Sequence, residues 1–234
     1  MQAMLGYGDD GTVSHFQEIS LDAFAAMLQI SNIEEITENT LKKKGNFYYH
    51  YVTEDKYMPC CYHLATLAYT HNWRTPANIK LLSNAINHIN NDLINETEGV
   101  LVKGGTGYVG AFGSMIRPHP PFTVDYVNAV VMHRRLLSEM AMTGAGTQID
   151  ILRQTADNIK EALHSDGILR LRYESESQKK ALTGGKYKAV GGYGDVFLEP
   201  NYKKKTALDC DLTFWAVQFL SLMNHSSCSA GGEA

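Results

Sequence analysis

The chain has 234 residues, 44% of them hydrophobic and 20% charged, so its composition is that of a folded globular protein and excludes a disordered chain. A formal net charge of −4, with lysines and arginines scattered along the sequence, argues against a nucleic-acid-binding protein. No apolar run reaches the roughly 20 residues that a bilayer-spanning helix needs, so no integral membrane segment is predicted.

The predicted location follows from the beginning of the chain and from its cysteines. Residues 1–11 carry two aspartates and few apolar side chains, which is unlike a signal peptide. Four cysteines stand at positions 60, 61, 210 and 228, without Cys-x-x-Cys spacing. Adjacent Cys60 and Cys61 are poorly placed to bridge each other. We therefore expect reduced thiols in a cytoplasmic protein.

Helical periodicity dominates the sequence. Apolar residues recur at helical spacing in six segments: 20–37, 55–71, 75–93, 123–143, 147–164 and 206–223. Ser20 is a candidate N-cap of the first segment, and Thr75 followed by Pro76 is a typical start for the third. Because their connectors are short, 55–71/75–93 and 123–143/147–164 are predicted to be antiparallel hairpins.

The two long connectors, 94–122 and 165–205, are rich in glycine and aromatic residues. Strand signals there are weak and confined to residues 100–102 and 168–171. We therefore predict an all-α protein made of helical hairpins joined by Gly/aromatic-rich loops.

An internal repeat supports a modular architecture. Gly6-Tyr7-Gly8-Asp9 returns as Gly192-Tyr193-Gly194-Asp195, and a looser copy begins at Gly107-Tyr108. Each copy precedes, by 15 to 17 residues, an apolar residue followed by an aspartate at the start of a helical pattern. This spacing predicts that Asp22, Asp125 and Asp209 occupy equivalent first turns.

Residues 209–216, Asp-Cys-Asp-Leu-Thr-Phe-Trp-Ala, resemble the Asp-x-Asp-Asp-Thr segment of class II terpenoid cyclases and the related helix of the squalene-cyclase and prenyltransferase repeat. Thr75 to Ile79 is similar to the opening of an outer helix in that architecture. The resemblance implies an α/α toroid, a ring of alternating inner and outer helices with a pocket at one end. We expect one such domain over 1–224, followed by a flexible tail, 225–234.

The sequence departs from the family in two places. Leu212 stands where the cyclases have a third acidic residue, and Asp209 is adjacent to Cys210, so the zinc-binding Asp-x-Cys pair of protein prenyltransferases is absent. No metal and no cofactor are therefore predicted. Six helices make about half of a toroid, so the ring is expected to be incomplete, or completed by a second copy or another partner.

The resemblance implies that Asp211 is the catalytic residue, a buried acid that protonates an isoprenoid double bond, with the Trp215 ring stabilising a carbocation. Asp209, which the repeat places in a recurring first turn, is interpreted as a favourable charge at a helix N-terminus. Prolines stiffen the loop that ends at Phe122, and such loops border toroid pockets. The predicted substrate-binding residues are Tyr108, Arg117, His119, Phe122, Asp125, Tyr193 and Trp215.

Cys60, Cys61 and His63 form another cluster of reactive side chains. A histidine beside a thiol can bind a metal, but zinc sites use two well-spaced ligand pairs, which this sequence lacks. We interpret His63 as an ordinary surface or core histidine. No catalytic Cys–His signature, Gly-x-Ser-x-Gly motif or EF-hand loop is recognised.

Three functions remain open from the sequence. The first is a prenyltransferase- or squalene-cyclase-like protein that binds or processes an isoprenoid. The second is a carbohydrate-active α/α toroid, either a glycoside hydrolase or a polysaccharide lyase, with aromatic platforms for sugars. The third is a non-catalytic helical-repeat scaffold. The expected partner is a small-molecule ligand, an isoprenoid or a glycan, whose identity the sequence does not specify.

Overall fold

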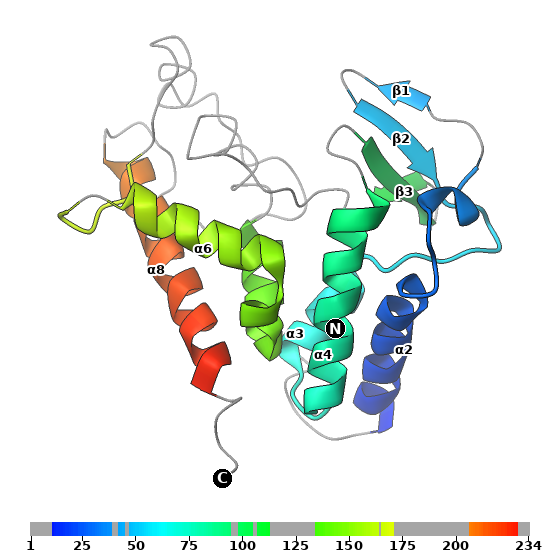
Figure 1. Ribbon diagram of the computed structural model, residues 1–234, viewed down its shortest axis with the longest axis horizontal. Coiled ribbons are helices and arrows are strands. Elements are labelled where there is room, and N and C mark those ends of the chain that lie inside the picture. The colour runs from blue at the N-terminus through cyan, green and yellow to red at the C-terminus, as the bar shows by residue number, and fades with distance from the viewer. Residues whose placement is uncertain are drawn as a thin grey trace.

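The computed structural model describes residues 11–38, 42–44, 47–94, 98–104, 107–112, 134–163, 165–170 and 206–228 (Figure 1). Its α-helices are α2 (Gly11–Met27), α3 (Cys61–Tyr69), α4 (Pro76–His88), a segment over 134–140, α6 (Asp150–Ala162) and α8 (Ala207–Cys228). Shorter helical turns are η1 (Ile33–Glu35), η2 (Ile89–Leu93), η3 (Ala141–Ala145) and η4 (Gly146–Gln148). The strands are β1 (Lys42–Lys44), β2 (Phe47–Tyr51), β3 (Glu98–Gly104) and β4 (Gly107–Gly110).

The prediction of an all-α protein is wrong, because four strands form a mixed sheet in the order β1-β2-β3-β4. β1 and β2 are antiparallel, β2 and β3 are parallel, and β3 and β4 are antiparallel. The parallel pair is connected through α3 and α4, since parallel strands need a long crossover. The protein is therefore α/β, and the all-α toroid that the resemblance implies is not its fold.

One face of the sheet is turned toward the helices and the other carries tyrosines. On the inner face, His50 of β2 lies opposite Val100 of β3, and both are buried. On the outer face, Tyr49 lies opposite Gly99, and a Cβ added at Gly99 would stand 2.9 Å from the Tyr49 ring. A side chain at position 99 would therefore force the Tyr49 ring to shift.

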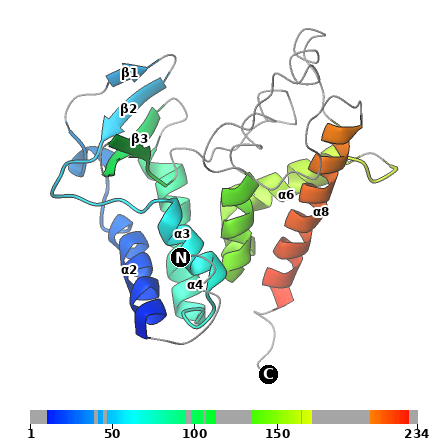
Figure 2. The same ribbon diagram turned by 180° about the vertical axis from the view of Figure 1, so that it is seen from behind.

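A single hydrophobic core joins the sheet and the helices. It includes Phe24 of α2, Leu64 of α3, Ile86 of α4, Met140 in the 134–140 segment and Phe219 of α8, all of them fully buried or nearly so. α2 packs against both α3 and α4. Figures 1 and 2 show the sheet at one end of α2 and α4, with α6 and α8 on the far side of α4.

One predicted helix start is confirmed and another is wrong. Thr75 caps α4 by accepting a hydrogen bond from the Asn78 amide at 3.2 Å, with Pro76 in the first helical position, as predicted. Ser20, in contrast, is not a cap, because α2 begins at Gly11 and the Ser20 hydroxyl donates to the Phe16 carbonyl within the helix. Asp22 therefore lies in the interior of α2.

The three-copy repeat receives no support where the structure describes it. Tyr7 and Tyr193 lie outside the described residues, as does Asp125. Tyr108 belongs to strand β4 and not to a turn before a helix. Of the three aspartates, Asp209 does lie in the first turn of a helix, as predicted, whereas Asp22 does not.

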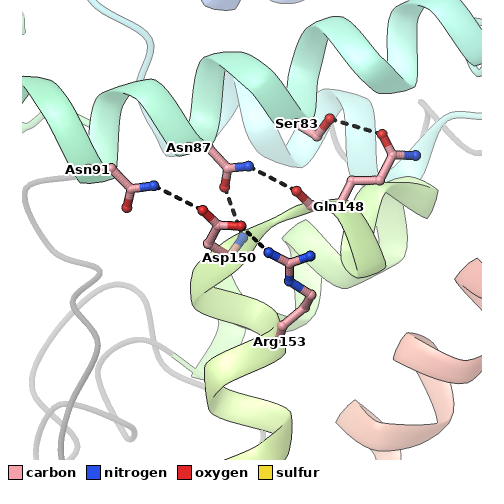
Figure 3. A network of polar contacts seen from close by, with 6 residues as sticks. All are labelled: Ser83, Asn87, Asn91, Gln148, Asp150 and Arg153. Carbon is pink, nitrogen blue, oxygen red and sulfur yellow. Dashed lines mark hydrogen bonds and ion pairs between the residues drawn. The ribbon is translucent and has the colours of Figure 1, made fainter.

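The beginning of α6 is held by polar side chains of α4 (Figure 3). Ile149, the N-cap residue of α6, has no side-chain group that can cap the helix. Asn87 of α4 supplies the cap: its Oδ1 accepts from the Asp150 amide at 2.9 Å, and its Nδ2 donates to the Gln148 carbonyl at 2.9 Å. Asn91 adds a bond to the Asp150 carboxylate at 3.0 Å.

We expect Asn87→Ala to lower the free energy of unfolding by about 1–2 kcal/mol, because a backbone donor and a backbone acceptor both lose their partner. Asn91→Ala, in the helical turn η2 that continues α4, is the matched control. Its single bond is exposed, so a change within about 0.5 kcal/mol is expected. Urea denaturation of the two variants measures both effects, and equal losses would contradict a capping role for Asn87.

Candidate active site

A pocket of about 800 Å³ opens between the ends of β2 and β3 and the segment that leads into α3. The cyan segment between β2 and α3 in Figure 1 carries most of its lining. The lining residues are Val52, Thr53, Glu54, Lys56, Tyr57, Met58, Cys60, Tyr62, His63, Val102 and Lys103. A cysteine, a histidine and a tyrosine therefore share one open cavity.

The segment before α3 is fixed by its backbone and by one buried side chain. Met58 is buried in the core, and the Pro59 carbonyl accepts a hydrogen bond from the Phe112 amide at 2.8 Å. The Phe112 ring in turn packs edge-on against Phe24 of α2. These contacts hold the residue that follows, Cys60, at the beginning of the helix.

Cys60 is the N-cap residue of α3. Its backbone is extended, with φ −126° and ψ 176°, and the helix begins at Cys61. The third helical residue, His63, turns back so that its Nδ1 accepts a hydrogen bond from the Cys60 amide at 3.0 Å. This contact is the return half of a capping box, with histidine in the position that glutamate or glutamine usually takes.

The same histidine nitrogen contacts the thiol. Cys60 Sγ lies 3.3 Å from His63 Nδ1, and the Tyr57 hydroxyl makes a short hydrogen bond with His63 Nε2. The Tyr57 and His63 rings are nearly perpendicular, at 81°, with their centroids 5.4 Å apart. Sulfur, imidazole and phenol thus form a continuous chain in which Tyr57 orients the histidine that contacts Cys60.

Hydrogen bonds to sulfur lower the pKa of Cys60 to about 4. The largest contribution is the hydrogen bond from the neighbouring Cys61 thiol, and further ones come from His63 and from the Tyr62 backbone amide, while burial opposes them. The N-terminus of α3 also favours a negative charge. These contacts favour the thiolate form of Cys60 at neutral pH.

Burial, and then the negative charge of Cys60, raise the pKa of Tyr57. Tyr57 is consequently a neutral phenol at neutral pH, able to accept a hydrogen bond from Nε2–H. The Cys60 amide and the Cys60 sulfur both lie within hydrogen-bond distance of the same nitrogen, His63 Nδ1. The two contacts therefore compete for one atom of the ring.

The far wall of the pocket ends in an exposed ion pair between Lys103 and Glu54. Their hydrogen bond lowers the pKa of Glu54 and raises the pKa of Lys103. Because both side chains are exposed to solvent, this pair contributes little to stability.

The structure places the predicted catalytic residue, Asp211, inside the protein. Its side chain is 2% exposed, and Oδ2 accepts a hydrogen bond from Arg134 Nη1 at 2.9 Å, with Arg134 equally buried. Trp215, one turn later on α8, is also buried; its ring stacks on Phe219 and its indole N–H donates to the Ser138 hydroxyl. Asp211 thus occupies the interior position expected of it, in a buried ion pair.

Of the other predicted substrate-binding residues that the structure describes, Tyr108 lies away from Asp211. Tyr108 is exposed on β4, where its ring packs edge-on against Tyr51. The sheet and α8 stand at opposite sides of the molecule (Figure 2), so Tyr108 is not a neighbour of Trp215. The remaining predictions, Arg117, His119, Phe122, Asp125 and Tyr193, lie outside the described residues.

The sequence interpretation of His63 missed this site. We expected a helix from residue 55, which would place Cys60 within a helix and leave its sulfur without special partners. In the structure α3 begins six residues later, at Cys61. A cysteine three residues before a histidine, directly after Pro59, is the signal of a helix start with a Cys–His contact.

Comparison with protein-family models, with curated proteins and with solved structures gives no match. Within the described ranges, no three histidine, cysteine, aspartate or glutamate side chains converge as a metal site would require. None of the helices described is both long enough and apolar enough to cross a membrane.

Proposed function

We propose that the protein is a cysteine-dependent enzyme of acyl transfer or hydrolysis, with Cys60 as the nucleophile and His63 as its proton-transfer partner. The observation that carries this proposal is the 3.3 Å contact between Cys60 Sγ and His63 Nδ1 at a helix N-terminus inside an open pocket. Nucleophilic cysteines depend on such a base and on an environment that stabilises the thiolate.

In the proposed reaction the Cys60 thiolate attacks the carbonyl carbon of an acyl group in the pocket. The bond to the leaving group then breaks, and the His63 imidazolium gives its proton to the departing atom. The resulting thioester on Cys60 is hydrolysed by water, with His63 as the base. Tyr57 keeps the imidazole ring oriented through its contact with Nε2.

The N-terminus of α3 contributes electrostatically at two points, before and during the attack of the thiolate. The positive end of α3 stabilises the thiolate before attack and the negative charge that develops on the carbonyl oxygen during attack. Val52, Met58 and Val102 supply an apolar wall in which these charges interact more strongly than in water.

The isoprenoid and carbohydrate predictions were tied to an α/α toroid. The mixed sheet excludes an all-α toroid, and neither prediction is part of the proposed function.

p-Nitrophenyl acetate, an activated ester that acetylates reactive thiols, tests the proposal directly. We expect a stoichiometric burst of nitrophenol, with the acetyl group on Cys60 in peptide mass spectrometry. Cys60→Ser should abolish the burst, and His63→Gln should slow it by about 10²-fold, the usual contribution of a positioned acid–base group.

Cys210, an exposed free cysteine on α8, is an internal control in the same molecule. Acetylation of Cys60 and Cys210 at equal rates would overturn the proposal, as would a burst that survives in Cys60→Ser. Tyr57→Phe removes only the hydroxyl that contacts His63, and its effect should be smaller than that of His63→Gln.

A further inference from the structure

Cys61 is a second thiol in the candidate site that the proposed acyl chemistry does not use. It is the first residue of α3 and follows directly after Cys60, the N-cap residue, and it is the largest cause of the lowered pKa of Cys60. Both cysteines are partly exposed, and Cys60 lines the pocket. A nucleophilic sulfur that a small oxidant can reach from the pocket is thus followed directly in the chain by a second thiol.

We propose that Cys60 and Cys61 form a peroxide-reactive pair, in which a hydroperoxide oxidises Cys60 and Cys61 then closes a disulfide with its neighbour. This inference rests on the nucleophilic Cys60 of the proposed function. It adds a modification site and a second class of reactant, a hydrogen peroxide or small organic hydroperoxide.

In the first step the Cys60 thiolate attacks the terminal oxygen of the hydroperoxide and the O–O bond breaks. Sulfur is oxidised by two electrons to a sulfenic acid, and the departing alkoxide or hydroxide takes the proton that His63 Nδ1 holds. In the second step the Cys61 sulfur attacks the sulfenic sulfur. An S–S bond forms, and the hydroxyl group leaves with the Cys61 proton as water.

The local backbone makes this disulfide easy to reverse. Neighbouring Cα atoms are about 3.8 Å apart across a trans peptide, whereas disulfides usually join Cα atoms about 4.4–6.8 Å apart. A bridge between residues 60 and 61 is consequently strained, and strained disulfides are the labile, regulatory ones. Adjacency places the two cysteines poorly for a bridge, so closing it distorts the peptide that joins them at the start of α3.

The bridge has two consequences for the site. It removes the nucleophile from reaction with acyl substrates, and it consumes the sulfenic acid before further oxidation to the irreversible sulfinic acid. Reduction by a thiol restores both cysteines, so the pair protects the nucleophile while it is exposed to peroxide.

Hydrogen peroxide, added to the full chain and followed by alkylation and peptide mass spectrometry, tests the inference. We expect a Cys60–Cys61 disulfide that forms at least about tenfold faster than any oxidation of Cys210 and that dithiothreitol reverses. In Cys61→Ser, where the serine hydroxyl keeps a hydrogen-bond donor beside Cys60, dimedone should trap the sulfenic acid that no longer has a partner. Cys60→Ser should remove the rapid oxidation entirely.

The inference is overturned if dimedone traps Cys60 equally in the wild type and in Cys61→Ser, or if the oxidised wild type contains no Cys60–Cys61 bridge. Acetylation of the unoxidised wild type is measured separately with p-nitrophenyl acetate. Loss of the disulfide with a normal acetyl burst defeats only this inference. A disulfide without any acetyl burst defeats only the acyl-transfer proposal.

Discussion

Asp211→Asn should lower the free energy of unfolding by about 3–5 kcal/mol, because removing one partner of a buried ion pair leaves the other as an uncompensated buried charge. Asp211 and Arg134 are each 2% exposed and are joined at 2.9 Å. The loss is large beside the roughly 5–15 kcal/mol that stabilises a typical domain. Chemical denaturation of the wild type and of Asp211→Asn measures this loss, provided that the two proteins have the same m-value.

Two further variants separate the ion pair from the helix itself. Asp209→Asn lies on the same helix and in its first turn, but its side chain is only partly buried, so a loss of about 0.3–1 kcal/mol is expected. The double variant Arg134→Met/Asp211→Leu replaces the pair by apolar groups and should recover much of the loss. An Asp211→Asn protein as stable as Asp209→Asn would contradict the buried pair.

The second expected result concerns how the rate of Cys60 alkylation by iodoacetamide depends on pH. Because the pKa of Cys60 is lowered to about 4, its thiolate fraction is nearly constant above pH 5.5, and the alkylation rate should be flat from pH 5.5 to 8. A cysteine in an unstructured peptide has a pKa of about 8.5, and its alkylation rate falls about tenfold for each pH unit below that value.

The size of the difference follows from two opposing effects. At pH 5.5 the peptide cysteine is only about 0.1% thiolate, which favours Cys60 by about 10³. A thiolate with a lower pKa is intrinsically less nucleophilic, by about 10² for this difference. Cys60 should therefore react about tenfold faster than the peptide at pH 5.5 and more slowly at pH 8.5, so the two rate profiles cross.

Variants of the hydrogen-bond donors identify the cause of the pKa shift. Cys61→Ala removes the donor that contributes most, and His63→Gln removes both a hydrogen bond and a positive charge. Each should raise the pKa of Cys60, so that the alkylation rate becomes pH-dependent between pH 5.5 and 8. A wild-type profile that rises steadily over this range would show that Cys60 is an ordinary thiol.

Local signals in the sequence determined part of this protein. Thr75 and Pro76 specify the start of α4, because a hydroxyl cap and a proline without an N–H both act within one turn. The apolar periodicity of residues 206–223 identified α8. Such features need no information from distant residues.

Tertiary structure decided the candidate site and most of the sheet, for which the sequence offered only the weak strand signal at 100–102, within β3. β2 pairs with β3, from about fifty residues further along the chain, and the pattern of a half-buried strand becomes visible only when its partner is known. The start of α3 depends on Met58 and Pro59 being anchored by the core and by Phe112. Because that anchor makes Cys60 an N-cap residue, it brings sulfur, His63 and Tyr57 into contact, which helical periodicity does not encode.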